Sequence, residues 1–296
     1  MISFDGPIMF GHTNGPSTFA TRLALQFQKM GHEIVPCDVP HDIHICFIEP
    51  FRSPHKSALR ILRLDGIDFR PEDFQANNAG IKRAYQSFDH VVIQSEHDRK
   101  MISKWLGTRD GVSVIGNGIE FINRSRSRTD HDLLFVCSAE WHPQKRVADN
   151  VKLFRQIEGA ENRPCKLIIL GDGAQEYAGQ NNIDVRGKVS HAECLQVFAD
   201  ADWMINLEWL GHCPNVCIEA LSMRCPIIYA DSGGLPELVG SNGIMVPDAP
   251  YGLELCDYDD PPALDLSGFI LPDQRIEVED IDRLRIENVA ARYLEI

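Results

Sequence analysis

The sequence predicts an α/β protein built from two doubly wound, Rossmann-like domains. Short apolar runs rich in β-branched residues alternate with longer stretches of helical periodicity along the chain, which is typical of parallel β–α units. The length of 296 residues suits two domains of ordinary size. The composition, 44% hydrophobic and 24% charged, is that of a globular protein with enough apolar material for two cores.

The first half opens with an expected strand at residues 2–4. A loop and a helix through Lys29 follow. Phe19, Leu23 and Phe27 share one face of that helix because they are spaced four residues apart. The other expected strands of this half are residues 33–36, 43–48, 61–64, 90–94 and 112–115. These elements assign residues 1–124 to an N-terminal domain.

The second half repeats the alternation. Its expected strands are residues 133–137, 167–170, 183–186, 203–207, 227–230 and 243–246, and its expected helices cover 147–157, 191–199 and a segment from about Val216. We expect a linker at 125–131, a C-terminal domain at 132–280 and a closing helix within 281–296 that is able to cross back to the first domain. The linker mixes small with basic residues and lacks aromatic ones, which favours a solvated connector over an RNA or phosphate site.

The charge is unevenly distributed along the chain. Residues 1–124 carry 14 basic and 14 acidic side chains, so the net charge of −14 comes from the second half. Ten carboxylates and one cation, Arg275, lie between Glu254 and Asp282. Nucleic-acid backbones and anionic lipid surfaces repel such a stretch, so we expect neither as a general partner.

Cysteines and apolar runs give no sign of export or of a membrane anchor. The nine cysteines include no C-x-x-C pair, which favours reduced, buried thiols over disulfides or zinc ligands. No run reaches the roughly 20 apolar residues that span a bilayer. The N-terminus has no signal-peptide pattern. We therefore expect a cytoplasmic protein.

Loops that follow expected strands of the second half carry residues suited to an anion. Ligands of parallel sheets bind beyond the carboxyl ends of the strands. Lys145 and Arg146 lie at a helix entry, where cations oppose the helix dipole unless an anion is bound. Three more loops contain GDG at 171–173, PNV at 214–216 and SGG at 232–234. Each glycine motif alone is more often a turn, but together the four loops indicate one phosphate-bearing ligand.

Glu219 is the most suggestive single residue. It lies about one turn into an apolar helix, beside Ile218 and Leu221. A carboxylate is costly in such surroundings unless something binds it. Glu237, by contrast, is explained as a partner of a helix dipole.

Several strings of this sequence occur together, in the same order, in one known family. They are CPNVCIEAL at 213–221, PII at 226–228 and SGGLPELV at 232–239, with WHPQKR at 141–146 and NGI at 117–119 upstream. GPS at 15–17 and GHE at 31–33 extend the similarity to the N-terminus. The chain thereby resembles the retaining glycosyltransferases of the GT-B fold that use nucleotide-sugar donors, the glycosyl transferases group 1 type. The resemblance covers residues 14 to about 246 and implies two Rossmann-like domains facing a central cleft.

The resemblance assigns roles to individual residues of the second domain. It implies that Lys145 holds the donor diphosphate, with Arg146 as a second cation, and that Glu219 accepts hydrogen bonds from the ribose hydroxyls. The amides of Asn215 and Val216 would meet the phosphates.

Further residues complete the implied donor site. The segment Gly187-Lys188-Val189 resembles the base-contacting loop, and Gly171 belongs to the same edge. Gly15 and Pro16 would approach the diphosphate from the other domain.

The reaction that the resemblance implies is transfer of a hexosyl group to a hydroxyl acceptor with retained anomeric configuration. The nucleotide-diphosphate sugar is a co-substrate, and neither a cofactor nor a metal is expected, because cations and helix N-termini neutralise the leaving group. The departing phosphate can itself deprotonate the acceptor, which would be a sugar, a glycan or a small molecule.

Two positions depart from the family pattern. Gly211 stands where the family has a glutamate that touches the transferred sugar, and we hypothesise that Glu208 or His212 replaces it. The N-domain histidine near the reacting centre has no match, and we expect Asp65, after the strand 61–64, near the acceptor.

Two further motifs have ordinary explanations. Asp257-Tyr258-Asp259 has the D-x-D pattern of a metal site, but it lies in an acidic, Pro-rich stretch, so a solvated loop is favoured. Trp141 and Trp203 are expected in the core, and Trp209, close to Gly211, is the tryptophan suited to stack on a sugar.

Two other functions compete with this interpretation. A binding protein for nucleotide sugars or glycans that has lost turnover is the first, and Gly211 is the observation that favours it. A dinucleotide-dependent oxidoreductase is the second, and it ranks last because no G-x-G-x-x-G follows the first strand of either half.

Overall fold

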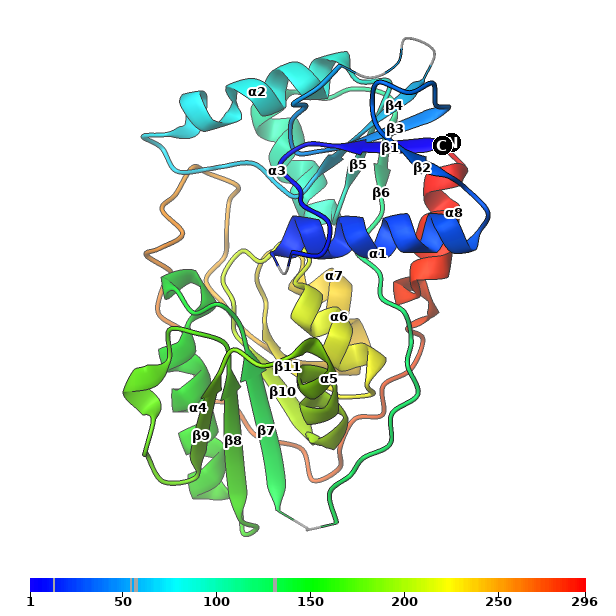
Figure 1. Cartoon of the computed structure of the whole chain (residues 1–296). Coiled ribbons are helices and arrows are strands. Elements are labelled where there is room, and N and C mark those ends of the chain that lie inside the picture. The colour runs from blue at the N-terminus through cyan, green and yellow to red at the C-terminus, as the bar shows by residue number, and fades with distance from the viewer. Residues whose placement is uncertain (13, 54, 56–57, 130–131) are drawn as a thin grey trace. The chain divides into compact units, whose positions relative to one another are not determined.

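The computed structural model describes residues 1–12, 14–53, 55, 58–129 and 132–296. The chain divides into two compact units (Figure 1). Unit 1 contains residues 1–120, 252–256 and 282–296, and unit 2 contains residues 121–251 and 257–281. Residues 130 and 131 of the expected linker lie outside the described residues.

Unit 1 is a doubly wound sheet of six parallel strands in the order β2-β1-β3-β4-β5-β6. The strands are β1 (Ile2–Asp5), β2 (Ile34–Val35), β3 (Ile43–Phe47), β4 (Leu59–Leu64), β5 (His90–Ile93) and β6 (Val112–Val114). The helices are α1 (Gly15–Lys29), α2 (Phe74–Ser87), α3 (Glu96–Leu106) and α8 (Ile286–Leu294), the last preceded by a 3₁₀ turn, η4 (Asp282–Leu284).

The start of α1 follows from its sequence. The side chain of Asn14 accepts a hydrogen bond from the amide of Ser17 at 2.9 Å, and Pro16 occupies a first-turn position where its missing N–H costs nothing. Phe19, Leu23 and Phe27 are buried, as their spacing predicts, in a core that the sheet shares with α8.

Unit 2 is a second six-stranded parallel sheet, in the order β12-β11-β10-β7-β8-β9. Its strands are β7 (Leu133–Ser138), β8 (Cys165–Leu170), β9 (Ile183–Gly187), β10 (Trp203–Asn206), β11 (Ile227–Ala230) and β12 (Gly243–Val246). Its helices are α4 (Val147–Ala160), α5 (His191–Asp200), α6 (Asn215–Ser222) and α7 (Leu235–Val239). The 3₁₀ turns are η1 (Pro143–Lys145), η2 (Gln175–Tyr177) and η3 (Gly240–Asn242).

The strand order of unit 2 reverses between β7 and β10. The chain runs outward from β7 through β8 to β9, and then returns through α5 to β10 on the other side of β7. This is the order 3-2-1-4-5-6 of dinucleotide-binding sheets, in which the ligand crevice lies at the reversal. The carboxyl ends of β7 and β10 are therefore the first place to look for a site.

Two late segments return to unit 1. The end of the chain packs there, where η4 and α8 contact residues 117–119 and α1 (Figure 1). Residues 252–256 were expected in the second domain, but they pack on unit 1. Trp105 Nε1 donates to the carbonyl of Leu253 at 2.9 Å, and the amide of Cys256 donates to Phe69 at 2.9 Å. These contacts join residues 148 and 187 positions apart in the sequence, which local periodicity cannot predict.

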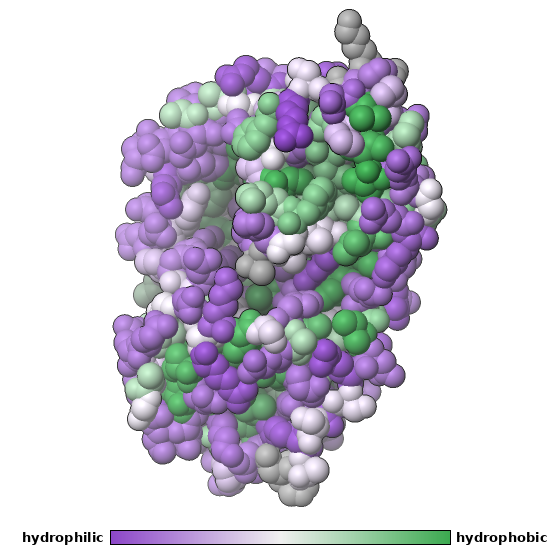
Figure 2. Space-filling view, in the orientation of Figure 1, coloured by the Kyte–Doolittle hydropathy of each residue, from purple (hydrophilic) through white to green (hydrophobic). Residues whose placement is uncertain are grey.

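Residues 121–129, at the expected boundary, pack on unit 2. Arg126 forms an ion pair with Asp202 at 2.8 Å, and the hydroxyl of Ser127 donates to Asp200 at 2.7 Å. The basic side chain of Arg126 thus neutralises a neighbouring carboxylate. Figure 2 shows hydrophilic residues over much of the face in view, which agrees with the charged composition.

The state of the cysteines agrees with the sequence analysis. All nine are free thiols, seven of them buried. The described residues contain no group of three or more His, Cys, Asp or Glu with the geometry of a metal site. Within the same residues, no helix is both long and apolar enough to cross a bilayer.

Candidate functional site

The reversal of the strand order in unit 2 brings together the loops that follow β7 and β10. Residues 139–146 leave β7, and residues 207–214 leave β10. Lys145 lies at the end of the first loop, in η1, and Glu208 near the start of the second. Both were singled out from the sequence, and the structure brings them into contact.

The ammonium of Lys145 donates to the carboxylate of Glu208 in a close ion pair. The two side chains differ in access to solvent: that of Lys145 is 24% exposed and that of Glu208 is 6% exposed. Burial strengthens the attraction between two opposite charges, because it removes water from between them. The cation at the edge of the sheet is thus held by an internal carboxylate.

Two hydrogen bonds also tie the two loops together. The amide of Trp209 donates to the carbonyl of Gln144 at 3.0 Å, and Gln144 Nε2 donates to the carbonyl of Trp209 at 2.9 Å. Trp209 itself is buried and packs edge-on against Tyr251. The proposed stacking of Trp209 on a sugar is therefore not supported, since its ring is part of the core.

Asn150, on α4, is a residue of this region that sequence analysis missed. It is buried, and its amide group donates to the carbonyls of Lys145 at 3.1 Å and Arg146 at 2.8 Å. Its carbonyl oxygen accepts from the amide of Leu207 at 3.2 Å. One side chain thus fixes the ends of both loops. Its place in the helical pattern gave no signal, because a buried asparagine differs from an exposed one only in its tertiary contacts.

Arg146 has a different role from the one predicted. Its guanidinium is 1% exposed and binds Asp248 through two hydrogen bonds, at 2.6 and 3.2 Å, and it also donates to the carbonyl of Pro262 at 2.7 Å. The residue adopts a left-handed backbone conformation, with φ of 52°. The buried side chain therefore stabilises the loop through Asp248 and Pro262. It is not available to bind an anion as a second cation.

Gly211 has a specific reason to be glycine. A Cβ atom at this position would lie 2.7 Å from Cδ of Glu208, so the Glu208 carboxylate occupies the space that a side chain at 211 would need. The following loop packs closely, with the amide of Gly234 donating to the carbonyl of Gly211 at 2.7 Å and Leu210 donating to Ser232 Oγ at 2.8 Å. Leu210 is left-handed, with φ of 52°.

Glu219 lies in α6, with its side chain 8% exposed. One of its carboxylate oxygens is 3.3 Å from Nε2 of His191, the first residue of α5, whose side chain is 53% exposed. The expectation that something binds this carboxylate is met in part by His191. The sequence gave no signal for the pair, because the two residues are joined only by the packing of α5 on α6.

Asn215 and Val216 form the first turn of α6 and are partly exposed. The amides of a first helical turn have no partner within the helix, so they are suited to an anion. Both residues follow the loop from β10, at the same edge of the sheet as Lys145.

The loops after β8 and β9 are joined at Gly171. Its amide donates to the carbonyl of Gly187 at 2.7 Å, and its φ is 93°. A Cβ atom at 171 would lie 1.7 Å from the carbonyl oxygen of Ala139, so Gly171 is required for close packing of two loops. Lys188 is exposed and Val189 partly exposed beyond Gly187, at the carboxyl end of β9.

Burial lowers the pKa of His142, and the positive charge of Lys145 lowers it further. The imidazole is therefore neutral at neutral pH and adds no cation beside Lys145. The pKa of Cys194 is raised to about 12, first by burial and then by the charge of Glu219. This thiol stays protonated.

Three of the predicted site residues belong to unit 1. Gly15 and Pro16 begin α1, and a Cβ atom at Gly15 would meet nothing within 4 Å, so packing within the unit does not demand a glycine there. Asp65 follows β4, lies 3.3 Å from the buried guanidinium of Arg63 and accepts a hydrogen bond from Gln94. All three lie at carboxyl ends of strands, or in the helix that follows one.

The D-x-D motif lies in a turn of unit 2. Asp257 and Asp259 are exposed, and Asp257 accepts a hydrogen bond from the amide of Asp259 at 3.0 Å. Asp259 also lies 3.9 Å from His142. This geometry agrees with the solvated acidic loop that the sequence favours.

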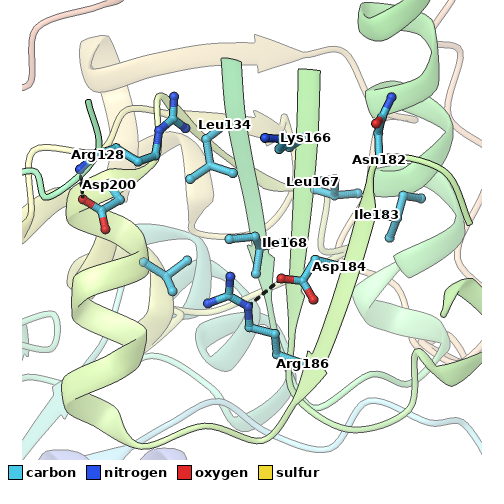
Figure 3. A pocket seen from close by; sticks show the side chains of 11 residues that line it. Arg128, Leu134, Lys166, Leu167, Ile168, Asn182, Ile183, Asp184, Arg186 and Asp200 are labelled. Carbon is cyan, nitrogen blue, oxygen red and sulfur yellow. Dashed lines mark hydrogen bonds and ion pairs between the residues drawn. The ribbon is translucent and has the colours of Figure 1, made fainter. Parts of the chain in front are cut away.

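A hollow of about 370 Å³ lies elsewhere on unit 2 (Figure 3). Its floor is apolar, with Leu134 and Ile168, and Lys166 and Asn182 line it near the amino ends of β8 and β9. Arg186 and Asp184, both on β9, are paired at 2.8 Å beside it. Ligands of doubly wound sheets bind at the opposite edge, so this hollow is not the candidate site.

Part of the chain resembles known proteins in sequence. Residues 130–254 match the family described as glycosyl transferases group 1. A curated relative from Bacillus subtilis (strain 168), named "Putative teichuronic acid biosynthesis glycosyltransferase TuaC", is 32% identical over 92 residues. The match covers 31% of this chain and 23% of that relative, so this chain spans less than a quarter of its length.

Solved structures share the fold over almost the full chain. HepE of Anabaena, in complex with UDP and glucose, has a TM-score of 0.68 at 16% identity and covers 99% of this chain and 98% of its own. A glycosyltransferase from Rickettsia africae ESF-5 has a TM-score of 0.67 at 14% identity, with 99% and 96% covered. The family match and the two parallel sheets agree with the resemblance inferred from the sequence: residues 130–254 match the glycosyl transferases group 1 family, and the chain has the GT-B fold.

Proposed function

We propose that this protein is a glycosyltransferase that moves a hexosyl group from a nucleotide-diphosphate sugar to a hydroxyl acceptor, with retained anomeric configuration and without a metal. The observation that carries the proposal is the position of Lys145. It is a partly exposed cation at the point where the strand order of unit 2 reverses, at the same edge of the sheet as the first turn of α6. A cation and the first-turn amides of a helix are both suited to a diphosphate.

In this proposal the donor binds along the carboxyl edge of unit 2. Lys145 binds the diphosphate, and the amides of Asn215 and Val216 contribute from the start of α6. Glu219, almost buried and next to His191, accepts the ribose hydroxyls. Segment 187–189 contacts the base.

Leaving-group stabilisation is the main source of catalysis that this site can offer. Negative charge develops on the diphosphate as the glycosidic bond breaks, and Lys145 and the amides of α6 stabilise it without rearrangement. The leaving phosphate takes the proton of the acceptor hydroxyl, so no separate base is needed. Of the residues in unit 1, Gly15 and Pro16 serve the donor diphosphate and Asp65 serves the acceptor.

Glu208 is our candidate for the carboxylate that binds the transferred sugar. Its position supports this choice over His212, since its carboxylate fills the space in front of Gly211, where the family carries its own glutamate. A change of Glu208 to Gln should lower turnover with the donor. If both Glu208→Gln and His212→Ala leave the donor KM and kcat unchanged, this assignment is wrong.

A thermal-shift screen of UDP, GDP, TDP and ADP and their sugars tests donor binding. The matching nucleotide should raise the Tm, and Lys145→Ala and Glu219→Ala should each abolish the shift while still folding. Donor hydrolysis or transfer is then assayed with the nucleotide sugar that binds. Binding without any turnover across the panel would favour the alternative of a binding protein, for which Gly211 is the specific observation.

The other expectations also remain proposals. We propose a cytoplasmic location and an acceptor that is a sugar, a glycan or a small molecule. Unchanged activity in EDTA would support the metal-independent reaction, and loss of activity that Mg²⁺ or Mn²⁺ restores would contradict it.

A further inference from the structure

The ion pair between Lys145 and Glu208 has no evident structural necessity. The two loops that it joins are already held by the reciprocal hydrogen bonds of Gln144 with Trp209 and by the three hydrogen bonds of Asn150. A buried ion pair adds little net stability in general, because removing two charges from water costs about as much as their attraction returns. The pair therefore calls for a functional explanation.

The geometry of the pair is asymmetric. Glu208 lies inside, with its side chain 6% exposed, whereas the Lys145 side chain is 24% exposed. Asn206 holds the backbone of Glu208. The amide of Glu208 donates to Asn206 Oδ1 at 3.1 Å, and Asn206 Nδ2 donates to Cys217 Sγ at 3.1 Å. An anion from solvent can approach the ammonium, while the carboxylate occupies its inner side.

The sequence is adapted to this placement of the carboxylate. Any side chain at 211 would begin 2.7 Å from Glu208 Cδ, so Gly211 is what allows the carboxylate to lie there. The φ of Gly211 is not in the left-handed region that demands glycine, so the close approach of Glu208 is the constraint at this position. The position of the Glu208 carboxylate thus depends on the glycine at 211.

We propose that Glu208 is a built-in counter-ion of Lys145. Its carboxylate neutralises the ammonium in the absence of donor, and the donor's diphosphate displaces it. The inference rests on the proposed function, and it adds that Glu208 sets the donor affinity of the site. A diphosphate that binds Lys145 brings at least two negative charges close to the Glu208 carboxylate. The two anions compete for one ammonium, and the displaced carboxylate becomes free to accept hydroxyls of the transferred sugar.

Inorganic pyrophosphate is the sharpest probe of this competition, because it carries the diphosphate without a base or a sugar. Titration calorimetry compares the full-length protein with Glu208→Gln. The glutamine keeps the shape and removes the charge, so pyrophosphate should bind roughly tenfold more tightly, which corresponds to about 1.4 kcal/mol. Glu158→Gln is the matched control, because Glu158 is ion-paired with Arg155 on α4, away from the loop. It should change the affinity by less than twofold.

Gly211→Ala provides an independent test that retains the charge. Its added methyl group must push the Glu208 carboxylate away from its present position, so it should also tighten pyrophosphate binding, by a smaller factor. Thermal unfolding of each variant confirms that it is folded. Stronger binding in both variants supports the inference, as does binding that is undetectable in the wild type and measurable in Glu208→Gln.

Unchanged or weaker binding by Glu208→Gln, with a wild-type protein that binds pyrophosphate, would overturn the inference while leaving the proposed function intact. Absence of pyrophosphate and UDP binding by the wild type and by every variant would overturn both. A change of the same size in Glu158→Gln would show a general charge effect and would also overturn the inference.

Discussion

Individual side chains in this protein are defined by partners that lie far away in the sequence. Lys145 and Arg146 are adjacent and both basic, yet one is partly exposed beside Glu208 and the other is buried on Asp248. The sequence could predict that cations lie at this helix entry. It could not predict which of them is available to a ligand, because Asp248 lies about 100 residues further along the chain.

The buried pair of Arg146 and Asp248 gives a prediction on stability. Arg146→Met should lower the free energy of unfolding by about 3–5 kcal/mol, because it leaves the fully buried carboxylate of Asp248 without its partner. Urea unfolding measures the change. Arg155→Met, which breaks a partly exposed pair on α4, is the control and should cost about 1 kcal/mol or less. Equal effects of the two substitutions would contradict the assigned role of Arg146.

His44 predicts how stability depends on pH. It is fully buried, its Nδ1 lies 2.8 Å from Ser3 Oγ, and burial lowers its pKa from 6.5 to about 4. Between these two values the unfolded chain binds a proton that the folded protein does not. The free energy of unfolding should therefore fall as the pH is lowered from 6.5 towards 4, by up to about 1.4 kcal/mol per pH unit, and this contribution should be constant above pH 6.5.

Urea unfolding of the wild type and of His44→Asn between pH 4 and 8 tests this prediction. The difference in stability between the two proteins should shrink as the pH falls, since the asparagine does not titrate. A difference that stays constant across this range would refute the role of His44.

Among the elements, the strands were the easiest to predict and the connections the hardest. Expected and observed strands overlap throughout both sheets, because buried parallel strands appear as continuous apolar runs. The expected strand at 61–64 begins earlier, at Leu59, since Leu59 and Arg60 are only partly buried and Arg60 interrupts the apolar run. The order of the strands, and with it the adjacency of β7 and β10, depends on long-range pairing that no local pattern encodes.

Gly171 tests the close packing of the loops after β7 and β8. Gly171→Ala should destabilise unit 2 well beyond the roughly 1–2 kcal/mol of a left-handed alanine, because its Cβ would overlap the carbonyl of Ala139. Gly179→Ala is the matched control, with a φ of 79° and no atom within 4 Å of the added carbon. Chemical unfolding measures the change in the free energy of unfolding for both variants. Similar costs at the two positions would show that the Gly171 contact is unimportant.

At the scale of the whole chain, the last helix completes the core of unit 1. Ile286, Val289 and Tyr293 of α8 are buried in the core that contains Phe19 of α1. Tyr293→Ala should therefore lower the stability of unit 1 by about 3–5 kcal/mol, as for other large aromatic truncations. The sequence indicated an amphipathic helix here and left its docking place open.

Calorimetric unfolding with and without pyrophosphate distinguishes the units in this variant. The unfolding transition that pyrophosphate shifts belongs to unit 2. Tyr293→Ala should leave the temperature of that transition unchanged and lower the temperature at which unit 1 unfolds. If Tyr293→Ala lowered only the temperature of the pyrophosphate-sensitive transition, the placement of α8 in unit 1 would be wrong.

In the function proposed above, the edge of unit 2 where the strand order reverses binds a diphosphate through Lys145. Calorimetric titration of UDP and inorganic pyrophosphate into the wild type, Lys145→Met and Lys152→Met tests it most directly, because both substitutions remove one cation from unit 2 and only one lies at the reversal. We predict at least a roughly tenfold loss of affinity in Lys145→Met and less than a twofold change in Lys152→Met. Equal losses in the two variants, or unchanged binding in Lys145→Met, would show that Lys145 does not bind the diphosphate.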